Sequence, residues 1–161
     1  MGLLTPIAVR VGRLSFMPKF LPQVVWTDQR IERLTGGRLT LLDIAGLPNI
    51  RLTVRGRRSG QWRTVPLLAV PRGDDWLIAG SNWGAPKQPV WVLNLEANPE
   101  CRVTVRRRTR DMRSRRLEGA ERQAAWDHMV RTWPNYDKYA ERTDREIKVF
   151  ELTPRPPLRF Q

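Results

Sequence analysis

The stretch GRRSGQWRTVP (residues 56–66) places three arginines in and just after a turn bounded by two glycines. Consecutive backbone N–H groups in such a turn form a nest that binds anions. Arg57, Arg58 and Ser59 add charged and hydroxyl donors at the same spot, and Arg63 follows four residues after the serine. Guanidinium donates paired hydrogen bonds to phosphate or carboxylate. The stretch therefore predicts an anion-binding element without a catalytic base; a solvated basic hairpin is the alternative that these residues leave open.

A second group of polar and aromatic residues lies in SNWGAPKQPVWVLNLEANPE (residues 81–100). Ser81 and Asn82 belong to a glycine- and proline-marked loop that a ligand can approach closely. Trp91 and Asn94 fall one turn apart on a predicted helix, which sets an aromatic wall beside an amide, as a flat heterocycle requires. The alternative is that the tryptophan packs in the core and the asparagine is a cap or a buried hydrogen-bonding group.

A third pattern is the recurrence of Trp133, Tyr136 and Tyr139 at every third residue. In a helix these side chains share one ridge, and a tyrosine hydroxyl there could donate a proton to a substrate. An aromatic stripe of this kind is also typical of a packed core, and the sequence leaves both interpretations open.

Eight arginines occur among the 15 residues from Arg102 to Arg116. They alternate in part with apolar positions, which predicts a strand with one basic, exposed face. Nucleic-acid binding is a hypothesis for this run, but the run lacks the interleaved aromatic residues of a stacking platform. A solvated face is therefore the expectation.

Composition narrows the classes of function. The chain has 161 residues and a net charge of +13, and 25 of its 29 basic residues are arginines. This excess favours a polyanionic partner: nucleic acid, an anionic membrane surface or a multiply charged small molecule. Cys101 and His128 are the only cysteine and histidine, which argues against a disulfide, a cysteine or histidine metal site, and a Ser-His-Asp triad. We expect no metal and a cytoplasmic protein.

Two units are expected along the chain. Residues 1–20 read as a basic amphipathic arm that could touch a membrane surface, at the inner face of the plasma membrane. Residues 21–161 form the folded domain, which opens with a short helix over residues 21–37. No apolar run reaches the roughly 18 residues that a membrane-spanning helix needs.

Hydrophobic periodicity assigns the remaining elements. IRLTVRG alternates as a half-buried strand, WRTVPLLAV and WLIAG continue a strand-rich segment through the turn PRGDD, and Pro66 belongs at an edge or a bulge. A helix follows Pro89, then come two alternating strands, a helix from Gly119, a helix begun by Pro134 and a closing strand. Hairpins dominate and no GxGxxG motif is present. The fold class is α+β, mainly β: an antiparallel barrel with helices packed around it.

Three blocks, LTVRGRRSGQWRTVPLL, SNWGAPKQPVWVLNLEANPE and WPNYDKYAERTDREIKVFELTP, resemble the deazaflavin-dependent nitroreductase family, whose members use coenzyme F-420. They match in order and spacing and span roughly residues 36–154. The resemblance implies a split β-barrel, like that of flavin mononucleotide (FMN)-binding oxidoreductases, and hydride transfer from the reduced deazaflavin to a small electron-poor acceptor: a quinone, a nitroaromatic or an activated enone. No nucleic-acid partner is then expected. FMN or haem on the same fold is the alternative, as is a non-enzymatic nucleic-acid-binding barrel; the oligomeric state stays open.

The resemblance also implies a site. The coenzyme has a phosphodiester and an oligoglutamate tail, which explains the basic turn. The implied cofactor-binding residues are Arg57, Arg58, Ser59, Arg63, Thr64, Val65, Pro66, Ala79, Gly80, Ser81, Asn82, Val90, Trp91 and Asn94. The implied substrate-binding residues are Leu68, Trp133, Tyr136 and Tyr139, of which the two tyrosines are the expected catalytic proton donors.

Overall fold

The protein is described from a computed structural model that places residues 41–155 continuously, together with scattered positions among the first 40. The predicted arm over residues 1–20, most of the predicted helix over residues 21–37 and the chain beyond residue 155 lie outside the described residues. Among the described residues, no helix combines the length and the apolar character needed to cross a membrane.

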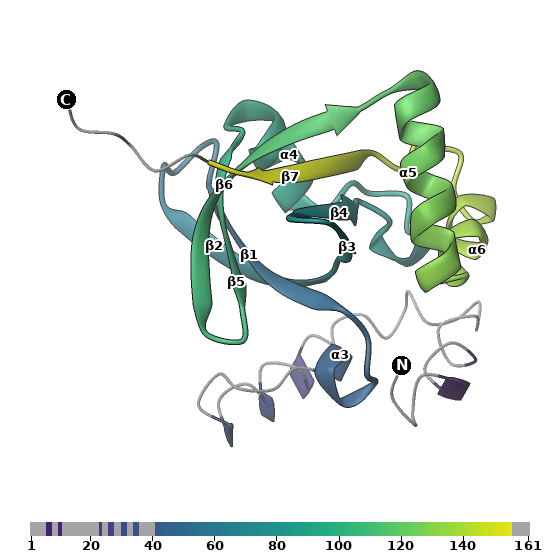
Figure 1. Ribbon diagram of the computed structural model, residues 1–161, viewed down its shortest axis with the longest axis horizontal. Coiled ribbons are helices and arrows are strands. Elements are labelled where there is room, and N and C mark those ends of the chain that lie inside the picture. The colour runs from purple at the N-terminus through teal and green to yellow at the C-terminus, as the bar shows by residue number, and fades with distance from the viewer. Residues whose placement is uncertain are drawn as a thin grey trace.

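The centre of the fold is one seven-stranded sheet in which every neighbouring pair is antiparallel. Its order is β2-β1-β5-β6-β7-β4-β3. The strands are β1 (Asn49–Arg55), β2 (Trp62–Leu68), β3 (Val70–Arg72), β4 (Asp75–Ala79), β5 (Glu100–Val105), β6 (Arg108–Leu117) and β7 (Val149–Pro154). Because the edge strands β2 and β3 are joined by a single residue, the sheet curls round into a split barrel (Figure 1). The predicted fold class is confirmed.

The single residue between the edge strands is Ala69, and it corrects one prediction. Residues 62–70 were expected to form one continuous strand, but the chain pairs with β1 up to Leu68 and with β4 from Val70 onward. At the break, the Ala69 amide donates to the Pro48 carbonyl oxygen at 3.2 Å. Closing a barrel requires this change of partner. Pro66 lies in the edge strand β2, as predicted, where its missing N–H group costs little.

Three helices were predicted from the sequence and are present: α4 (Val90–Ala97), α5 (Gly119–Thr132) and α6 (Asn135–Glu141). The short helix α3 (Leu41–Ile44) and a 3-10 turn before α4, η2 (Asn82–Gly84), were not predicted. Pro89 and Pro134 stand directly before α4 and α6. Figure 1 shows α5 and α6 together at one side of the barrel. These two helices therefore cover the outside of the sheet, and the turn before α4 packs against α6.

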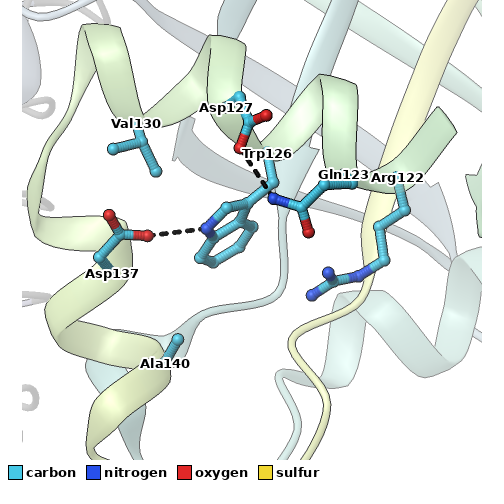
Figure 2. A pocket seen from close by; sticks show the side chains of 7 residues that line it. All are labelled: Arg122, Gln123, Trp126, Asp127, Val130, Asp137 and Ala140. Atoms are coloured by element: carbon cyan, nitrogen blue, oxygen red, sulfur yellow. Dashed lines mark hydrogen bonds between the residues drawn. The ribbon is translucent and has the colours of Figure 1, made fainter. Parts of the chain in front are cut away.

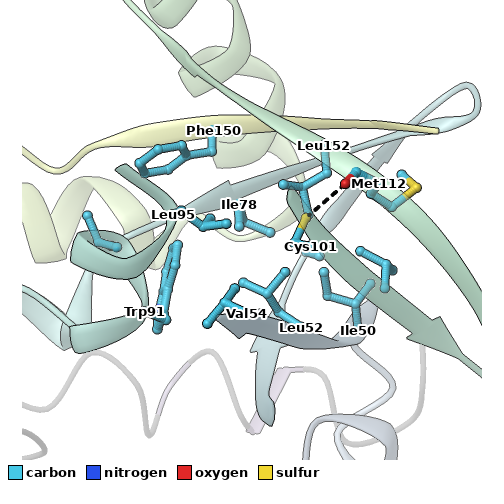
Figure 3. Close-up of a cluster of buried hydrophobic side chains, with 13 residues drawn as sticks. Ile50, Leu52, Val54, Ile78, Trp91, Leu95, Cys101, Met112, Phe150 and Leu152 are labelled. Atoms are coloured by element: carbon cyan, nitrogen blue, oxygen red, sulfur yellow. Dashed lines mark hydrogen bonds between the residues drawn. The ribbon is translucent and has the colours of Figure 1, made fainter. Parts of the chain in front are cut away.

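One core fills the space between the sheet and α4 (Figure 3). Ile50, Leu52 and Val54 of β1 are at most 1% exposed and point into it, while the intervening residues of the strand face outward. Trp91 of α4 packs edge-on against Phe150 of β7, with ring centroids 6.1 Å apart. The alternating pattern of β1 is therefore what orients the inner face of the barrel.

A second core lies on the outer face of β4 and β7, beneath α5 and α6. Adjacent strand residues point to opposite faces, so Leu77 and Val149 belong to this core while Ile78 and Phe150 belong to the first. The second core holds most of the aromatic residues of the C-terminal half. The sheet thus separates two buried clusters, and the predicted site residues are distributed over both.

Candidate functional site

The glycine-bounded turn between β1 and β2 is closed by its own backbone. The Gly56 amide donates to the Gln61 carbonyl oxygen and the Gly60 amide donates to the Gly56 carbonyl oxygen, both at 2.8 Å. Gly60 has a φ of +67°, which favours glycine. Within the described part of the chain, the amides of Arg58 and Ser59 are the ones in this turn that have no hydrogen-bond partner. The predicted anion nest is therefore reduced to these two adjacent N–H groups.

The turn is tied to α4 by Arg57. Its backbone amide and its guanidinium Nη1 both donate to Asn94 Oδ1, at 3.2 and 3.3 Å. Asn94 is 4% exposed, so its amide is a buried acceptor rather than an open surface group. Two residues 37 positions apart, both predicted for cofactor binding, therefore contact each other directly.

The turn keeps its positive charge. Arg57, Arg58 and Arg63 are exposed, and no carboxylate in residues 41–155 forms an ion pair with any of them. An unpaired guanidinium in this position can bind a phosphate or a carboxylate with paired hydrogen bonds. The electrostatics of the turn therefore fit an anionic ligand.

Strand β2 presents its predicted residues on two faces. Arg63 and Val65 pair with Val54 and Leu52 of β1, so their side chains lie on the inner side of the sheet. Thr64 and Pro66 lie on the outer side, where Thr64 Oγ1 and Thr53 Oγ1 are 2.8 Å apart. The structure therefore brings the side chains of Arg63 and Val65, but not those of Thr64 and Pro66, to the face that carries the first core.

The loop between β4 and α4 has an unusual backbone. Asn82, Trp83 and Gly84 have φ values of 45°, 57° and 80°, three successive residues in the left-handed region. Such a conformation costs a non-glycine residue about 1–3 kcal/mol and persists only where surrounding contacts hold it. Gly80 sits where an added Cβ would lie 2.6 Å from Val92 Cγ2, so the loop lies tightly against α4. The predicted residues Ala79 to Asn82 are therefore part of a closely held, strained segment.

Arg145 is the group that holds this loop, and the sequence interpretation missed it. Its guanidinium donates to the carbonyl oxygens of Gly80, Ser81 and Ala85 at 2.8–2.9 Å and to Gln88 Oε1 at 3.1 Å. Burial lowers the pKa of the Arg145 guanidinium, because it removes water that stabilises the charged form. No local pattern marks this residue, since its partners lie 57–65 positions earlier in the chain.

The predicted substrate residues meet in the second core. Trp133, Tyr136 and Tyr139 are 2–6% exposed, and Leu68 packs against the same cluster. The rings of Tyr136 and Tyr139 lie edge to face, with centroids 6.3 Å apart. Trp83, which the sequence interpretation did not single out, also packs against this cluster.

Burial raises the pKa of both tyrosine hydroxyls. For Tyr136 the cause is desolvation, with the neighbouring Tyr139 adding to it. For Tyr139 desolvation again dominates, while hydrogen bonds with the Trp133 and Asn135 side chains and the charge of Arg142 act the other way. Both phenols therefore stay protonated at neutral pH and are not bases there.

The remaining two helix residues differ in exposure. Trp91 is 8% exposed and belongs to the first core, whereas Val90 is 65% exposed. The structure agrees with the alternative interpretation of Trp91 and Asn94, a core ring and a buried hydrogen-bonding amide. A cofactor contact of either residue stays a prediction.

A groove of about 520 Å³ lies elsewhere, between α5 and α6 (Figure 2). It is lined by Arg122, Gln123, Trp126, Asp127, Val130, Asp137 and Ala140, none of which was predicted for the site. Its carboxylates already accept hydrogen bonds at 2.8 Å, Asp137 from Trp126 Nε1 and Asp127 from Gln123 Nε2. The groove therefore does not coincide with the charged turn or the strained loop. In the described parts of the chain, no cluster of histidine, cysteine or carboxylate side chains could hold a metal ion.

Comparison with known proteins gives consistent matches. A family model described as F420H(2)-dependent quinone reductase matches residues 23–154. An F420H(2)-dependent quinone reductase of Mycobacterium tuberculosis is 30% identical over 136 residues, which are 83% of this chain and 91% of that protein.

Solved structures agree. A structure of an F420-H2 dependent reductase (FDR-A) has a TM-score of 0.61 and 37% identity, covering 65% of this chain and 93% of that one. A structure described as a domain-swapped dimer has a TM-score of 0.63 and 34% identity, covering 79% and 96%. The HutZ haem storage protein of Vibrio cholerae, at 13% identity and a TM-score of 0.52 over 80% and 90% of the two chains, shares the fold alone.

Proposed function

The chain belongs to the F420H(2)-dependent quinone reductase family, and from that membership we propose how its residues bind the coenzyme and the acceptor. It is an oxidoreductase that uses coenzyme F-420 and transfers hydride to an electron-poor acceptor. Among the acceptor classes, we propose a quinone, as in the family description; nitroaromatic and enone reduction are finer possibilities for the same site. FMN is the secondary candidate for cofactor.

The residues of the turn fit the coenzyme's charge. The tail of coenzyme F-420 carries a phosphodiester and carboxylates. Within residues 41–155, the turn offers guanidinium groups without carboxylate partners beside the two unpartnered amides of Arg58 and Ser59. Arg57 and Arg58 would bind the tail, and Arg63 would extend the positive surface along the inner side of β2. Asn94 supports this arrangement by holding Arg57 from behind.

The ring end of the coenzyme would lie along the strained loop. Gly80 and Ser81 are buried at this point, whereas Asn82 is half-buried and is held by a hydrogen bond from its Nδ2 to the Lys87 carbonyl oxygen at 3.0 Å. Val65 and Val90 would add apolar contacts to the rings of the coenzyme. When bound, the reduced coenzyme supplies a hydride from C5 of its deazaflavin ring.

The acceptor end would be the aromatic cluster that contains Leu68 and Trp133. A quinone that takes up a hydride must also take up one proton, which leaves a hydroquinone. Tyr139 is the proposed group that orients or protonates the acceptor oxygen, because burial keeps its hydroxyl protonated and its main chain contacts the strained loop at Gly84. Tyr136 would support that ring through the edge-to-face contact.

The observation that carries the proposal is the contact of Arg57 with Asn94 of α4, in a turn whose arginines have no carboxylate partner among the described residues. The direct test is a fluorescence titration of the purified full chain with oxidised coenzyme F-420, together with a quinone-reduction assay using the reduced form. We expect saturable binding at micromolar concentration, weakened by salt, and hydroquinone formation. Absence of saturable binding, or a preparation that carries FMN or haem, would contradict the proposal.

A further inference from the structure

The loop between β4 and α4 lies beside both proposed sites and contains Trp83, to which neither site assigns a role. Trp83 is a bulky residue held with φ 57° and ψ 22°, a left-handed backbone that glycine or asparagine adopts more readily. It stands directly after Ser81 and Asn82, which are assigned to the coenzyme. A tryptophan kept in such a conformation indicates a local constraint that the rest of the structure enforces.

The side chain of Trp83 points away from the first core and toward the second. It is half-buried and packs against the cluster that holds Leu68, Trp133, Tyr136 and Tyr139. The residue thus has its backbone in the proposed coenzyme loop and its ring on the proposed acceptor residues.

Close backbone packing leaves this ring little freedom. A Cβ added to Gly84 would lie 2.8 Å from the Tyr139 carbonyl oxygen and 2.7 Å from Arg142 Cβ, so the loop is pressed directly onto α6. Within the turn, the Gly84 amide donates to Ser81 and the Ala85 amide donates to Asn82, each to the carbonyl oxygen at 2.9 Å. The direction of the Trp83 ring is therefore set by the backbone around it.

Arg145 holds both ends of the same turn. Its donations to Gly80 and Ser81 lie before Trp83 and those to Ala85 and Gln88 lie after it, so one guanidinium spans the strained segment. A lysine at this position would keep the charge but could not donate to four acceptors in this planar arrangement.

We propose that Trp83, held by Arg145, forms one side of the acceptor site where that site adjoins the coenzyme, and limits the size of the acceptor. The inference rests on the proposed function, since it concerns which quinones that site accepts. Trp83 is a specificity-determining residue in this proposal, and Arg145 is a positioning residue that acts through it.

The test compares a one-ring acceptor, duroquinone, with a two-ring acceptor, menadione, in wild type and Trp83→Gly. Glycine removes the ring and suits the left-handed backbone, so we expect the fold to persist. The ratio of kcat/KM for menadione to that for duroquinone should rise about tenfold, the scale of discrimination by pocket volume. Menadione should also bind more tightly, by a similar factor, to the protein loaded with oxidised coenzyme, while the Kd of the coenzyme changes less than about threefold.

A matched control is Trp62→Phe, because Trp62 is exposed on the outer face of the barrel. It should leave both ratios at the wild-type value. If Trp83→Gly fails to fold, Trp83→Asn serves in its place, since asparagine also tolerates this backbone.

The role of Arg145 is tested by a double-mutant cycle. Arg145→Lys alone should shift the acceptor ratio about fivefold, but in the Trp83→Gly background it should shift it less than about twofold, because the ring through which it acts is gone. Equal shifts in both backgrounds, or an unchanged ratio in Trp83→Gly, would overturn the inference. Failure of the wild type to bind coenzyme or to reduce either quinone would instead overturn the proposed function.

Discussion

The turn between β1 and β2 and the run from Arg102 to Arg116 are both rich in arginine, but among the described residues only the run has arginines paired with carboxylates. In the turn, the arginines lack carboxylate partners among the described residues, and one of them is held by a neutral amide, Asn94. In the run, Arg102 pairs with Asp111 at 3.1 Å, and Arg115 and Arg116 bind carboxylates contributed by other elements. The comparison shows that the neighbours of a guanidinium, and not its presence, decide whether it can bind a ligand.

The run works as a set of cross-links between elements. Arg115 of β6 and Arg72 of β3 both bind Glu151 of β7, which is 6% exposed. Arg116 contacts carboxylates on α4 and on the segment before β7, at Glu96 and Glu146. Its hairpin tip, Arg106–Arg108, remains exposed. The paired arginines of the run thus stabilise contacts between elements of the fold, whereas the arginines of the turn can bind an anionic ligand.

The largest expected effect separates the two regions directly. Replacing Arg57 and Arg58 together by alanine should weaken coenzyme binding about 100-fold or more, since each lost charge-assisted hydrogen bond is worth about 1.5–3 kcal/mol. The measurement is the fluorescence titration with oxidised coenzyme F-420. Arg107→Ala with Arg108→Ala is the matched control and should keep the wild-type Kd within about twofold. An equal loss in both double variants would show that general positive charge, not the turn, binds the coenzyme.

The second effect concerns the run. Glu151→Gln removes the buried carboxylate shared by two arginines and should lower the free energy of unfolding by about 2 kcal/mol in a urea titration. Coenzyme affinity should stay unchanged. Asp111→Asn serves as control, because Asp111 is exposed and its pair with Arg102 should contribute less than about 1 kcal/mol. A loss of coenzyme binding without a loss of stability in Glu151→Gln would remove the distinction between the regions.

A third change gives an arginine of the turn a carboxylate partner like those of the paired arginines in the run. Asn94→Asp keeps the shape of the acceptor that holds Arg57 but gives it a charge, so the guanidinium acquires a carboxylate partner like those in the run. Coenzyme affinity should fall about tenfold, because the new carboxylate competes with the anionic tail. The titration described above measures it, and Asn94→Ala shows how much of the change comes from losing the hydrogen bonds alone. Unchanged affinity in Asn94→Asp would mean that Arg57 does not contact the coenzyme.

The smallest expected effect is a pH dependence of the free energy of unfolding that comes from Cys101. Burial raises the pKa of Cys101, at the start of β5, from 9.0 to about 12. Its stabilising contribution is therefore complete below pH 9.0 and is lost as pH rises toward 12, because the unfolded chain releases the proton first. Unfolding should cost about 0.8 kcal/mol less at pH 9.5 than at pH 7. Cys101→Ala should flatten that part of the pH profile. A profile unaffected by Cys101→Ala would contradict the assignment.

Short-range patterns account for most of the elements. The alternation in IRLTVRG predicts β1 and its buried face, Pro66 predicts an edge strand, and Pro89 and Pro134 predict where α4 and α6 begin. These predictions succeed because they depend on residues within one or two turns of each other. The break at Ala69 could not be predicted, since nothing in the local sequence records that the barrel closes there.

The three motif blocks, read from the sequence by itself, determined the family and the coenzyme, because both are recorded in contiguous residues. Tertiary structure alone decided that Asn94 holds Arg57 and that Arg145 spans the strained loop. It also decided which arginines are neutralised by carboxylates and which faces of β2 point inward. The physical reason is that strand register and barrel closure, rather than neighbouring residues, determine which distant groups come within hydrogen-bonding distance.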